Sequence, residues 1–570
     1  MKNRLIYSIG ILSLMLTACS GGEDDQVQKL AEGGKLYGGS FAFMSTEKIK
    51  DLLPFTSSDM YAQRLTTQIF ESLFKIDPTT LKSTPFLAEK LTVKNEAKTY
   101  VITLRKGVFF HENECFDGEL AEMTSEDVKF SLEIACSKKY RNQMAYLLLD
   151  HIKGAKQAYA QLGANQKINL PAIKIINPFK IEIELEEASA EFERILSHSG
   201  LSIVSKKSFD FYGAKISSNP IGTGPFAWNK KVGNDLFLKR NANYWRKDEF
   251  GNQLPFLNEV KIIYNTDKKK EFEAFQNKDI DIVVEIPAKD IKHTLGSLSD
   301  AQNGKNVKHK LYANQSLNIN YLAFACEHSI FQNKDLRMAF HYALDKQDIT
   351  SNYLRGDGWA VEHGFVPEMN LGSDYQVKGI AQNIPLAKSL LAKAGYPEGK
   401  NFPVLDLYVN ALPGTHSYAM CQGVKAQLKQ NLNITLNIKA CTLAERDRAI
   451  QSGKAILWRG GWIADYVDPE TFLSLFYGEN IHQDITSVNN FRYRNAAYDQ
   501  IFKASLKELN PEKRLKMLEQ CDQIIVNESP AIPIYSDDFL VMVNIRVRDF
   551  VSSSFESLDL SSIFIKEPRK

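Results

Sequence analysis

The 570-residue sequence lacks the short motifs that most often carry chemistry. It contains no Cys-x-x-Cys pair, no two histidines four positions apart, and no Gly-Lys-Ser/Thr or Gly-x-Ser-x-Gly segment. These absences argue against the common zinc and thioredoxin-like sites, the metalloprotease helix, the phosphate-binding loop and the nucleophile elbow. We therefore expect neither an enzyme nor a bound metal or other cofactor.

A net charge is also missing from most of the chain. Lysine and arginine number 70 against 68 aspartates and glutamates, and Lys2 and Arg4 are the basic residues before position 19, so the remainder carries 68 of each sign. A chain without net positive charge has no general electrostatic attraction for nucleic acid or for an anionic membrane surface. We expect no nucleic-acid partner.

The chain opens with the pattern of an export signal. Lys2 and Arg4 precede an apolar run at residues 5–16, and small residues follow it up to Cys19. This order is typical of a secretory signal, and the run is too short to span a bilayer as a permanent helix.

The segment LTAC at residues 16–19 resembles the bacterial lipobox, in which the chain is cut before the cysteine and the cysteine is lipidated. We therefore predict a signal peptide at residues 1–18, and a lipidated Cys19 with a flexible polar tether at residues 19–36. The alternative is an ordinary signal peptide that happens to contain a cysteine. In either case the protein is exported, and the acidic residues at 23–25 leave open whether it stays in the periplasm or reaches the outer surface.

Six cysteines follow the predicted lipidation site, and an exported chain can pair them. Their spacing does not determine any pairing. They are Cys115, Cys136, Cys326, Cys421, Cys441 and Cys521.

Strand-like and helix-like segments alternate along the chain. Residues 99–110 begin with the alternation of a strand, and after a loop Thr124 is a predicted helix N-cap, with Asp127 at the capping-box position. Residues 317–324 again have the pattern of a strand. A helix is predicted after it, with one apolar face formed by Leu336, Phe340, Ala343 and Leu344. This mixture favours α/β domains, and the length requires more than one.

Taken in order, several segments resemble the bacterial extracellular solute-binding proteins of family 5, the peptide-binding components of ABC transporters. One departure is the loop HENECFDGELAEM, which is longer than the short turn usual at that place. The segments are PFLAEKLTVKNEAKTYVITLRKGVFFH (85–111), TSEDVKFSL (124–132), NPIGTGPF (219–226), LKRNANYWRKDEFGNQLPFLNEVKIIY (238–264), AFQNKDIDIV (274–283), YLAFA to DKQDI (321–349), GGWIADYVDPETFL (460–473) and EKRLKMLEQCDQIIVNESPAIPIY (512–535).

This resemblance implies a two-lobed, type II periplasmic-binding-protein fold with a hinged ligand cleft. Lobe I is expected at residues 37–264 and again at 536–570, with an extra subdomain inserted at about 85–215. Lobe II is expected at 265–535. The family also implies a monomer.

The resemblance places the ligand at the segment WRGGWIADYVDPETFL. Asp465 occupies the position at which peptide-binding relatives hold the ligand's α-ammonium, and a fixed carboxylate suits that task because it forms short charge-assisted hydrogen bonds. Arg459 lies six residues earlier, where some relatives bind a peptide's C-terminal carboxylate, and a guanidinium can do so with two hydrogen bonds.

The residues between these two charges suit a peptide backbone. Gly460 and Gly461 lack side chains and allow a ligand strand to approach closely, and the main chain at Gly461 and Ile463 is expected to bond the peptide's amides. Trp462 is expected either to cover the ligand with its ring or to pack in the core.

From these residues we predict a membrane-tethered, extracytoplasmic receptor that binds short peptides by lobe closure. Its implied partners are the permease and ATPase subunits of an ABC transporter. One alternative keeps the fold but binds a nickel chelate, haem, an oligosaccharide or another non-peptide solute; a second is a surface adhesin. Peptide length and side-chain preference are not determined by the sequence.

Overall fold

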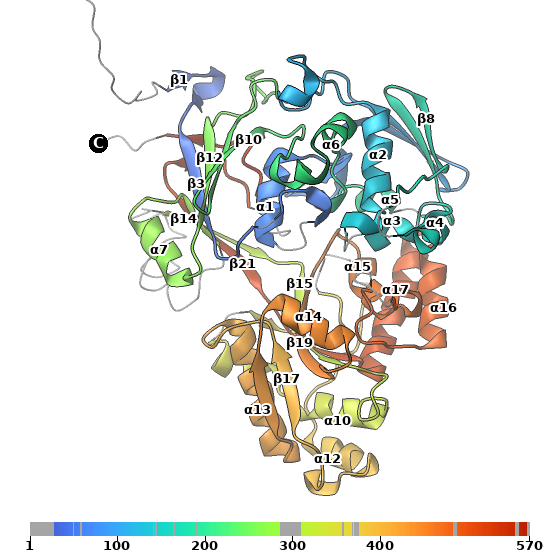
Figure 1. The fold of residues 1–570 in the computed structure, drawn as a ribbon. Coiled ribbons are helices and arrows are strands. Elements are labelled where there is room, and N and C mark those ends of the chain that lie inside the picture. The colour runs from blue at the N-terminus through green and yellow to red at the C-terminus, as the bar shows by residue number, and fades with distance from the viewer. Residues whose placement is uncertain are drawn as a thin grey trace, which may run out of the picture.

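The computed structural model has two lobes, one above the other in Figure 1. It describes residues 28–566 except 50, 57–59, 141, 143–144, 164–165, 190, 285–308, 356–357, 368, 370–374, 483–486 and 553–557. The predicted signal peptide and Cys19 lie outside the described residues. Within those residues, no helix is long and apolar enough to cross a membrane.

The upper lobe contains two four-stranded sheets. The first has the order β10–β11–β12–β3, with β12 and β3 parallel. Helix α1 (Met60–Ile69) and the C-terminal segment pack on it and form a common core. Its strands are β3 (Ser40–Ser45), β10 (Phe226–Val232), β11 (Asp235–Arg240) and β12 (Glu259–Tyr264).

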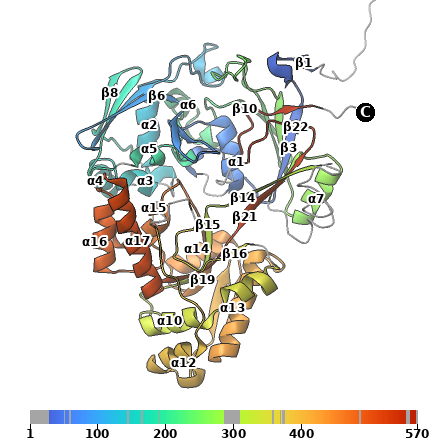
Figure 2. The same cartoon turned by 180° about the vertical axis from the view of Figure 1, so that it is seen from behind.

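The second sheet lies on the other side of the upper lobe, together with α2 to α6 (Figures 1 and 2). It is antiparallel, in the order β6–β7–β9–β8. We infer that these elements are the inserted subdomain expected at residues 85–215. They are β6 (Ala88–Lys94), β7 (Thr99–Leu104), β8 (Ile173–Asn177), β9 (Lys180–Glu184), α2 (Ser125–Ala135), α3 (Tyr146–Leu149), α4 (Ala155–Gln161), α5 (Phe192–Ile195) and α6 (Lys206–Tyr212).

The lower lobe is built on a mixed six-stranded sheet in the order β16–β20–β15–β19–β17–β18. Helices α10 (Lys334–Ala343), α12 (Ile384–Lys393) and α13 (His416–Leu432) share a core with it. The strands are β15 (Asn318–Phe324), β16 (Trp359–Ala360), β17 (Leu405–Val409), β18 (Leu436–Ala440), β19 (Leu457–Ile463) and β20 (Ala531–Ser536).

The lower half of the molecule also contains helices α14 to α17. Helix α14 (Leu443–Gln451) precedes β19, and the short α15 (Glu470–Leu473) follows it. Helices α16 (Ala496–Ser505) and α17 (Pro511–Glu528) lie side by side next to the inserted subdomain in both views.

Two adjacent strands cross between the lobes. Strand β14 (His309–Gln315) pairs with β21 (Asp538–Asn544) in a small sheet that also contains β13 (Ile282–Val284). This sheet packs on the core of β3, and its two longer strands continue into the paired strands β15 and β20 of the lower lobe. We infer that the hinge lies at residues 315–318 and 536–538, which places β13 and β14 with the upper lobe although lobe II is expected to begin at residue 265.

Several local predictions are confirmed. Thr124 caps α2, its backbone amide donates to Asp127 at 3.0 Å, and the capping box is formed. Residues 318–324 form β15. Helix α10 buries Leu336, Phe340 and Ala343 as predicted, but it ends at Ala343, and Leu344 has extended backbone angles. The predicted apolar face is therefore one residue too long.

All six cysteines after Cys19 are free thiols, and Cys115, Cys136, Cys421 and Cys521 are buried. Burial raises the pKa of the Cys115 thiol to about 11 and those of Cys421 and Cys521 to about 12. The disulfides that an exported chain can form are thus not formed here.

Candidate ligand-binding site

A cavity of about 740 Å³ lies between the lobes and is lined by both of them. The upper wall comes from α1, residues 70–76 and the loop 197–202, and the lower wall from α14 and residues 461–465. Its volume is in the range of pockets that enclose small-molecule ligands. The cavity is therefore the candidate binding site.

The end of β19 exposes one edge of its backbone to this cavity. Strand β15 pairs with β19 along its whole length, whereas β17 pairs with it only at Leu457 and Trp458. The amide of Ala464 donates to Leu317 on the β15 side, at 2.8 Å. Because successive residues of a strand alternate in direction, the amide and carbonyl groups of Gly461 and Ile463 point away from β15. These two residues line the cavity, where an extended ligand can pair with them.

The two glycines of β19 have different surroundings. A side chain at Gly460 would collide with the ring of Tyr321, since its Cβ would lie 2.2 Å from the nearest ring atom. Gly460 therefore serves packing within the sheet. Gly461 is exposed on the cavity side, and its Cβ would lie 3.2 Å from the guanidinium of Arg459.

Trp462 and Arg459 take different positions relative to the cavity. Trp462 is half-buried, packs against a buried hydrophobic cluster and also lines the cavity, so its ring is placed where it could cover a ligand. Arg459 is half-buried and donates to the side-chain oxygen of Asn320. It is not among the residues that line the cavity.

Asp465 lines the cavity with its side chain only 11% exposed. The hydroxyl of Tyr146 donates to Oδ2 at 2.6 Å, and Thr471 donates to the same oxygen at 3.3 Å. His198 Nε2 lies 3.5 Å from Oδ1. Tyr146 and His198 come from the upper lobe, so the carboxylate of Asp465 is contacted by both lobes.

The loop after Asp465 is fixed by a buried ion pair. The Arg514 guanidinium donates to both oxygens of Asp468, at 2.6 and 2.9 Å, and to Glu470 at 2.5 Å. The backbone amide of Glu470 also donates to Asp468 at 2.9 Å. Asp468 thus accepts a backbone amide at the start of α15 and at the same time ties this loop to α17.

Glu71 forms the buried polar part of the upper wall. It accepts hydrogen bonds from the hydroxyl of Thr223 at 2.8 Å, the hydroxyl of Tyr244 at 2.7 Å and the indole of Trp245 at 3.0 Å. Burial raises the pKa of the Glu71 carboxyl above its usual value, against the effect of these hydrogen bonds. Glu71 joins α1 to the strand-connecting segments of the upper lobe.

The cavity lining carries charges of both signs. Arg446 of α14 is the cation next to β19: its guanidinium lies 3.4 Å from the carbonyl of Arg459 and 2.6 Å from Asn410 Oδ1. Such a lining suits a ligand that itself carries both charges. Among the described residues, no three His, Cys, Asp or Glu side chains are grouped as a metal site requires. The lining ions are Arg64, Lys75, Arg246, Arg446, Arg448, Glu71, Asp447, Asp465 and Asp559.

Most residues of this site are not predicted from the sequence, among them Glu71, Tyr146, His198 and Arg446. Each lies in a different segment, and Tyr146 is 319 positions from Asp465. No local spacing links them. The capping box that precedes Arg446, formed by Thr442 and Glu445, predicts a helix start but not a cavity wall.

The chain matches the model of the bacterial extracellular solute-binding proteins, family 5 (middle region), over residues 82–484. It is 24% identical over 509 residues to di/tripeptide-binding protein 3 of Pseudomonas aeruginosa, covering 88% of this chain and 89% of that protein. It is 25% identical over 494 residues to the glutathione-binding protein GsiB of Salmonella choleraesuis, covering 84% and 86%.

Among solved structures, the chain resembles the periplasmic binding protein DppA of Helicobacter pylori, determined in complex with the peptide STSA. The TM-score is 0.77 at 20% identity, over 93% of this chain and 99% of that one. This likeness establishes the fold, and the predicted two-lobed, type II α/β architecture is confirmed.

The ion pair at Asp468 extends into the upper lobe and generates a prediction about pH. Arg194 of α5 lies 2.8 Å from Glu191 and 3.5 Å from Asp468. Burial, and then repulsion by Asp468, raise the pKa of Glu191 to about 7. The pKa of Glu191 in the folded protein exceeds its ordinary value, so the neutral carboxyl stabilises the folded state. This contribution to the free energy of unfolding is fully present below pH 4.5 and is lost as the pH rises through about 7.

We therefore expect Glu191→Gln, which mimics the protonated acid, to gain about 1–3 kcal/mol of stability relative to the natural protein between pH 5 and pH 8. Urea unfolding at several pH values measures the difference. Glu89→Gln, at an exposed position of β6, is the control, and its free energy of unfolding should change with pH as that of the natural protein does. Parallel curves for Glu191→Gln as well would contradict the assignment.

Proposed function

The chain belongs to the bacterial extracellular solute-binding proteins of family 5, and on this premise we propose that it captures short peptides in the cavity between its lobes, holding each by its free amino terminus. The observation that carries the proposal is the carboxylate of Asp465, which lines the cavity directly after the open backbone edge of β19. An ammonium group can bind this carboxylate while the peptide backbone pairs with Gly461 and Ile463.

The proposed contacts explain a broad choice of peptides. Main-chain hydrogen bonds to β19 are the same for every sequence, and Trp462 offers an apolar surface without a shape-specific pocket. A ligand without the ammonium would leave the Asp465 carboxylate buried and unpaired, which is costly. Selection therefore acts on the peptide's terminus more than on its side chains.

For the peptide's other end we propose two arginines at neighbouring places. Arg446 of α14 lines the cavity. Arg459, the residue expected from the sequence, is in β19, and its carbonyl lies beside the Arg446 guanidinium. A guanidinium can bind a carboxylate through two parallel hydrogen bonds. Arg446 would meet the carboxylate inside the cavity, and Arg459 would be reached by one peptide length only.

Binding is proposed to drive lobe closure, because a ligand held by both walls stabilises the closed form. The closed protein would then deliver the peptide to the permease of an ABC transporter, whose ATPase subunits supply the energy. We further propose that the chain acts as a monomer outside the cytoplasm, tethered to a membrane through lipid on Cys19. The role is one of binding, as in the named relatives, rather than catalysis.

The amino-terminal anchor is tested with the lipid-free protein (residues 20–570) after bound ligand has been removed. Thermal unfolding is followed with pools of di- to pentapeptides, each free and N-acetylated. A ligand at a hundred times its Kd adds about 2.7 kcal/mol, so free peptides should raise the midpoint of the natural protein, and acetylated ones, which bind more weakly, should not raise it at the same concentration. Asp465→Ala should abolish the shift while the ligand-free midpoint stays within a few degrees. If free peptides still raise the unfolding midpoint of this variant, Asp465 is not the ammonium anchor. If no pool raises the midpoint of the natural protein, the ligand is a non-peptide solute.

The carboxylate end is tested by comparing peptide acids with the matching amides in calorimetry. Arg446→Ala should remove most of the preference for the acid, a loss of roughly ten-fold in affinity. Arg459→Ala should act on a single peptide length. Lys278, an exposed cation far from the cavity, supplies the control Lys278→Ala. Equal losses for acids and amides would show that neither arginine binds the carboxylate.

The tether is tested by expressing the full chain in a bacterium and labelling it with a radioactive fatty acid. The natural chain should be labelled and sediment with membranes, because two or more acyl chains hold a protein firmly. Cys19→Ser should be unlabelled and soluble. Label that persists in this variant would rule out Cys19 as the acceptor.

A further inference from the structure

The carboxylate of Asp465 is contacted by side chains of its own lobe and of the opposite lobe. Oδ2 accepts from Tyr146 at 2.6 Å and from Thr471 at 3.3 Å, and Nε2 of His198 lies 3.5 Å from Oδ1. A carboxylate offers about four acceptor positions on its two oxygens. Oδ2 is thus occupied, whereas Oδ1 keeps a position for a ligand's ammonium.

The tautomer of His198 follows from its second contact. Its Nδ1 accepts the backbone amide of Gly200 at 3.0 Å, at the start of the short helix Ser199–Leu201. A neutral imidazole has one N–H, so the proton must be on Nε2, the nitrogen that faces Asp465. His198 therefore has two separable tasks: Nδ1 accepts the amide of a turn in the upper lobe, and the Nε2–H faces Oδ1 of Asp465 in the lower lobe at 3.5 Å.

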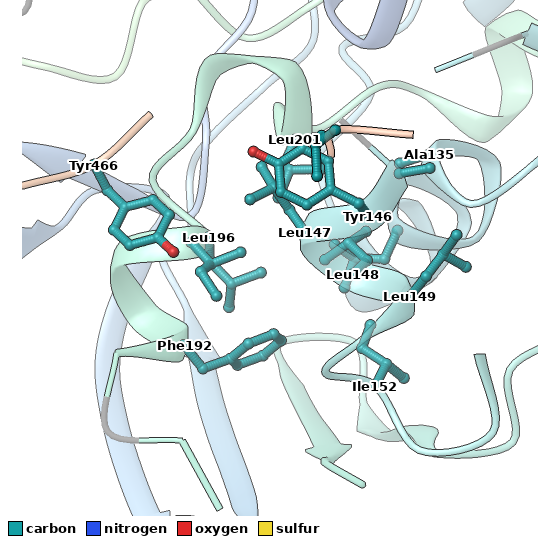
Figure 3. Close-up of a cluster of buried hydrophobic side chains, with 14 of the residues drawn as sticks. Ala135, Tyr146, Leu147, Leu148, Leu149, Ile152, Phe192, Leu196, Leu201 and Tyr466 are labelled. Atoms are coloured by element: carbon teal, nitrogen blue, oxygen red, sulfur yellow. The ribbon is translucent and has the colours of Figure 1, made fainter. Parts of the chain in front are cut away.

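Tyr146 is held in place by packing. Its ring belongs to the buried cluster that also contains Leu147, Leu196 and Leu201 (Figure 3). The tyrosine is 6% exposed, so its hydroxyl cannot turn to solvent without disturbing that cluster. Through the short hydrogen bond to Asp465, the position of the carboxylate therefore depends on the position of the inserted subdomain.

The same region of the upper lobe grips the loop at a second point. Arg194, four residues before His198, donates to the carbonyl of Val467 at 3.0 Å. The loop that carries Asp465 is thus held from the upper lobe on both sides of Tyr466. When the lobes separate, the contacts of Tyr146, His198 and Arg194 with this loop are all lost, and only Thr471 remains on the carboxylate from its own lobe.

We propose that Tyr146 and His198 are positioning residues, which orient the Asp465 carboxylate as the lobes close and thereby confine selection for a free amino terminus to the closed state. This inference rests on the proposed role of Asp465 as the ammonium anchor. In the open form the carboxylate keeps only its contact with Thr471, is exposed to water and binds amines weakly. In the closed form it is fixed, shielded from water and aimed at the ligand.

The test compares affinities for a free peptide and its N-acetylated form, because a purely structural role would lower both equally. Tyr146→Phe keeps the packed ring and removes the donor. We expect its affinity for the free peptide to fall about ten-fold while the affinity for the acetylated peptide stays unchanged. Tyr100→Phe is the matched control: this buried tyrosine of the inserted subdomain donates to the carbonyl of Ser189 and does not line the cavity.

Two replacements separate the tasks of His198. Asparagine places an oxygen near the position of Nδ1, so His198→Asn keeps the cap and loses the donor. Glutamine places an N–H near the position of Nε2, so His198→Gln keeps the donor and loses the cap. We expect His198→Asn to lose selectivity at unchanged stability, and His198→Gln to keep selectivity at reduced stability.

The outcomes are distinguishable from failure of the proposed function. Asp465→Asn is measured in parallel: if it leaves the ratio of free to acetylated affinity unchanged, the anchor itself is wrong. If it removes the ratio whereas Tyr146→Phe and His198→Asn preserve it, only the positioning role is overturned. A higher affinity of Tyr146→Phe for free peptides would also overturn it, because Tyr146 would then compete with the ligand.

Discussion

The arrangement of the site depends on one buried ion pair, that of Arg514 with Asp468 and Glu470. Strand β19 ends at Ile463, and nothing in a strand fixes the direction of the loop that follows it. Arg514, reaching over from α17, binds both acids of that loop while all three side chains are at most 8% exposed. A buried charge of either sign is costly unless it is paired, so the loop has essentially one acceptable conformation. In that conformation Asp465 faces the cavity.

The sequence predicts the parts of this structure that follow from neighbouring residues. The cap of α2 at Thr124 is a three-residue pattern, and β15 is a simple alternation. The segment from Gly460 to Asp465 is indicated by a resemblance; Gly461, Trp462 and Asp465 line the cavity, whereas Gly460 packs against Tyr321 within the sheet. Arg459, in contrast, lies beside the cavity, since its contact with Asn320 depends on the register of β15 against β19.

What the sequence does not predict is long-range. Tyr146 and His198 belong to the inserted subdomain, which shares a buried cluster with residues of α16 and α17, and no periodicity or motif in the sequence predicts such packing. The hinge is similar: β13 and β14 pair with β21, which is more than 200 residues away, so their place in the upper lobe follows from strand pairing rather than from the order of segments. The end of α10 at Ala343 is a smaller case, in which an apolar residue continues the helical pattern after the helix has stopped.

The free thiols have a consequence for how this protein is made. A fold held by disulfides needs an electron acceptor during folding and is lost in a reducing compartment. This fold needs none, because its two lobes are held by packed cores and paired strands. The four buried thiols are also poor nucleophiles at neutral pH, since burial disfavours their thiolates. Because none of the six cysteines in the described part of the chain forms a disulfide, this fold can be reached in a reducing or an oxidising compartment, on either side of a membrane.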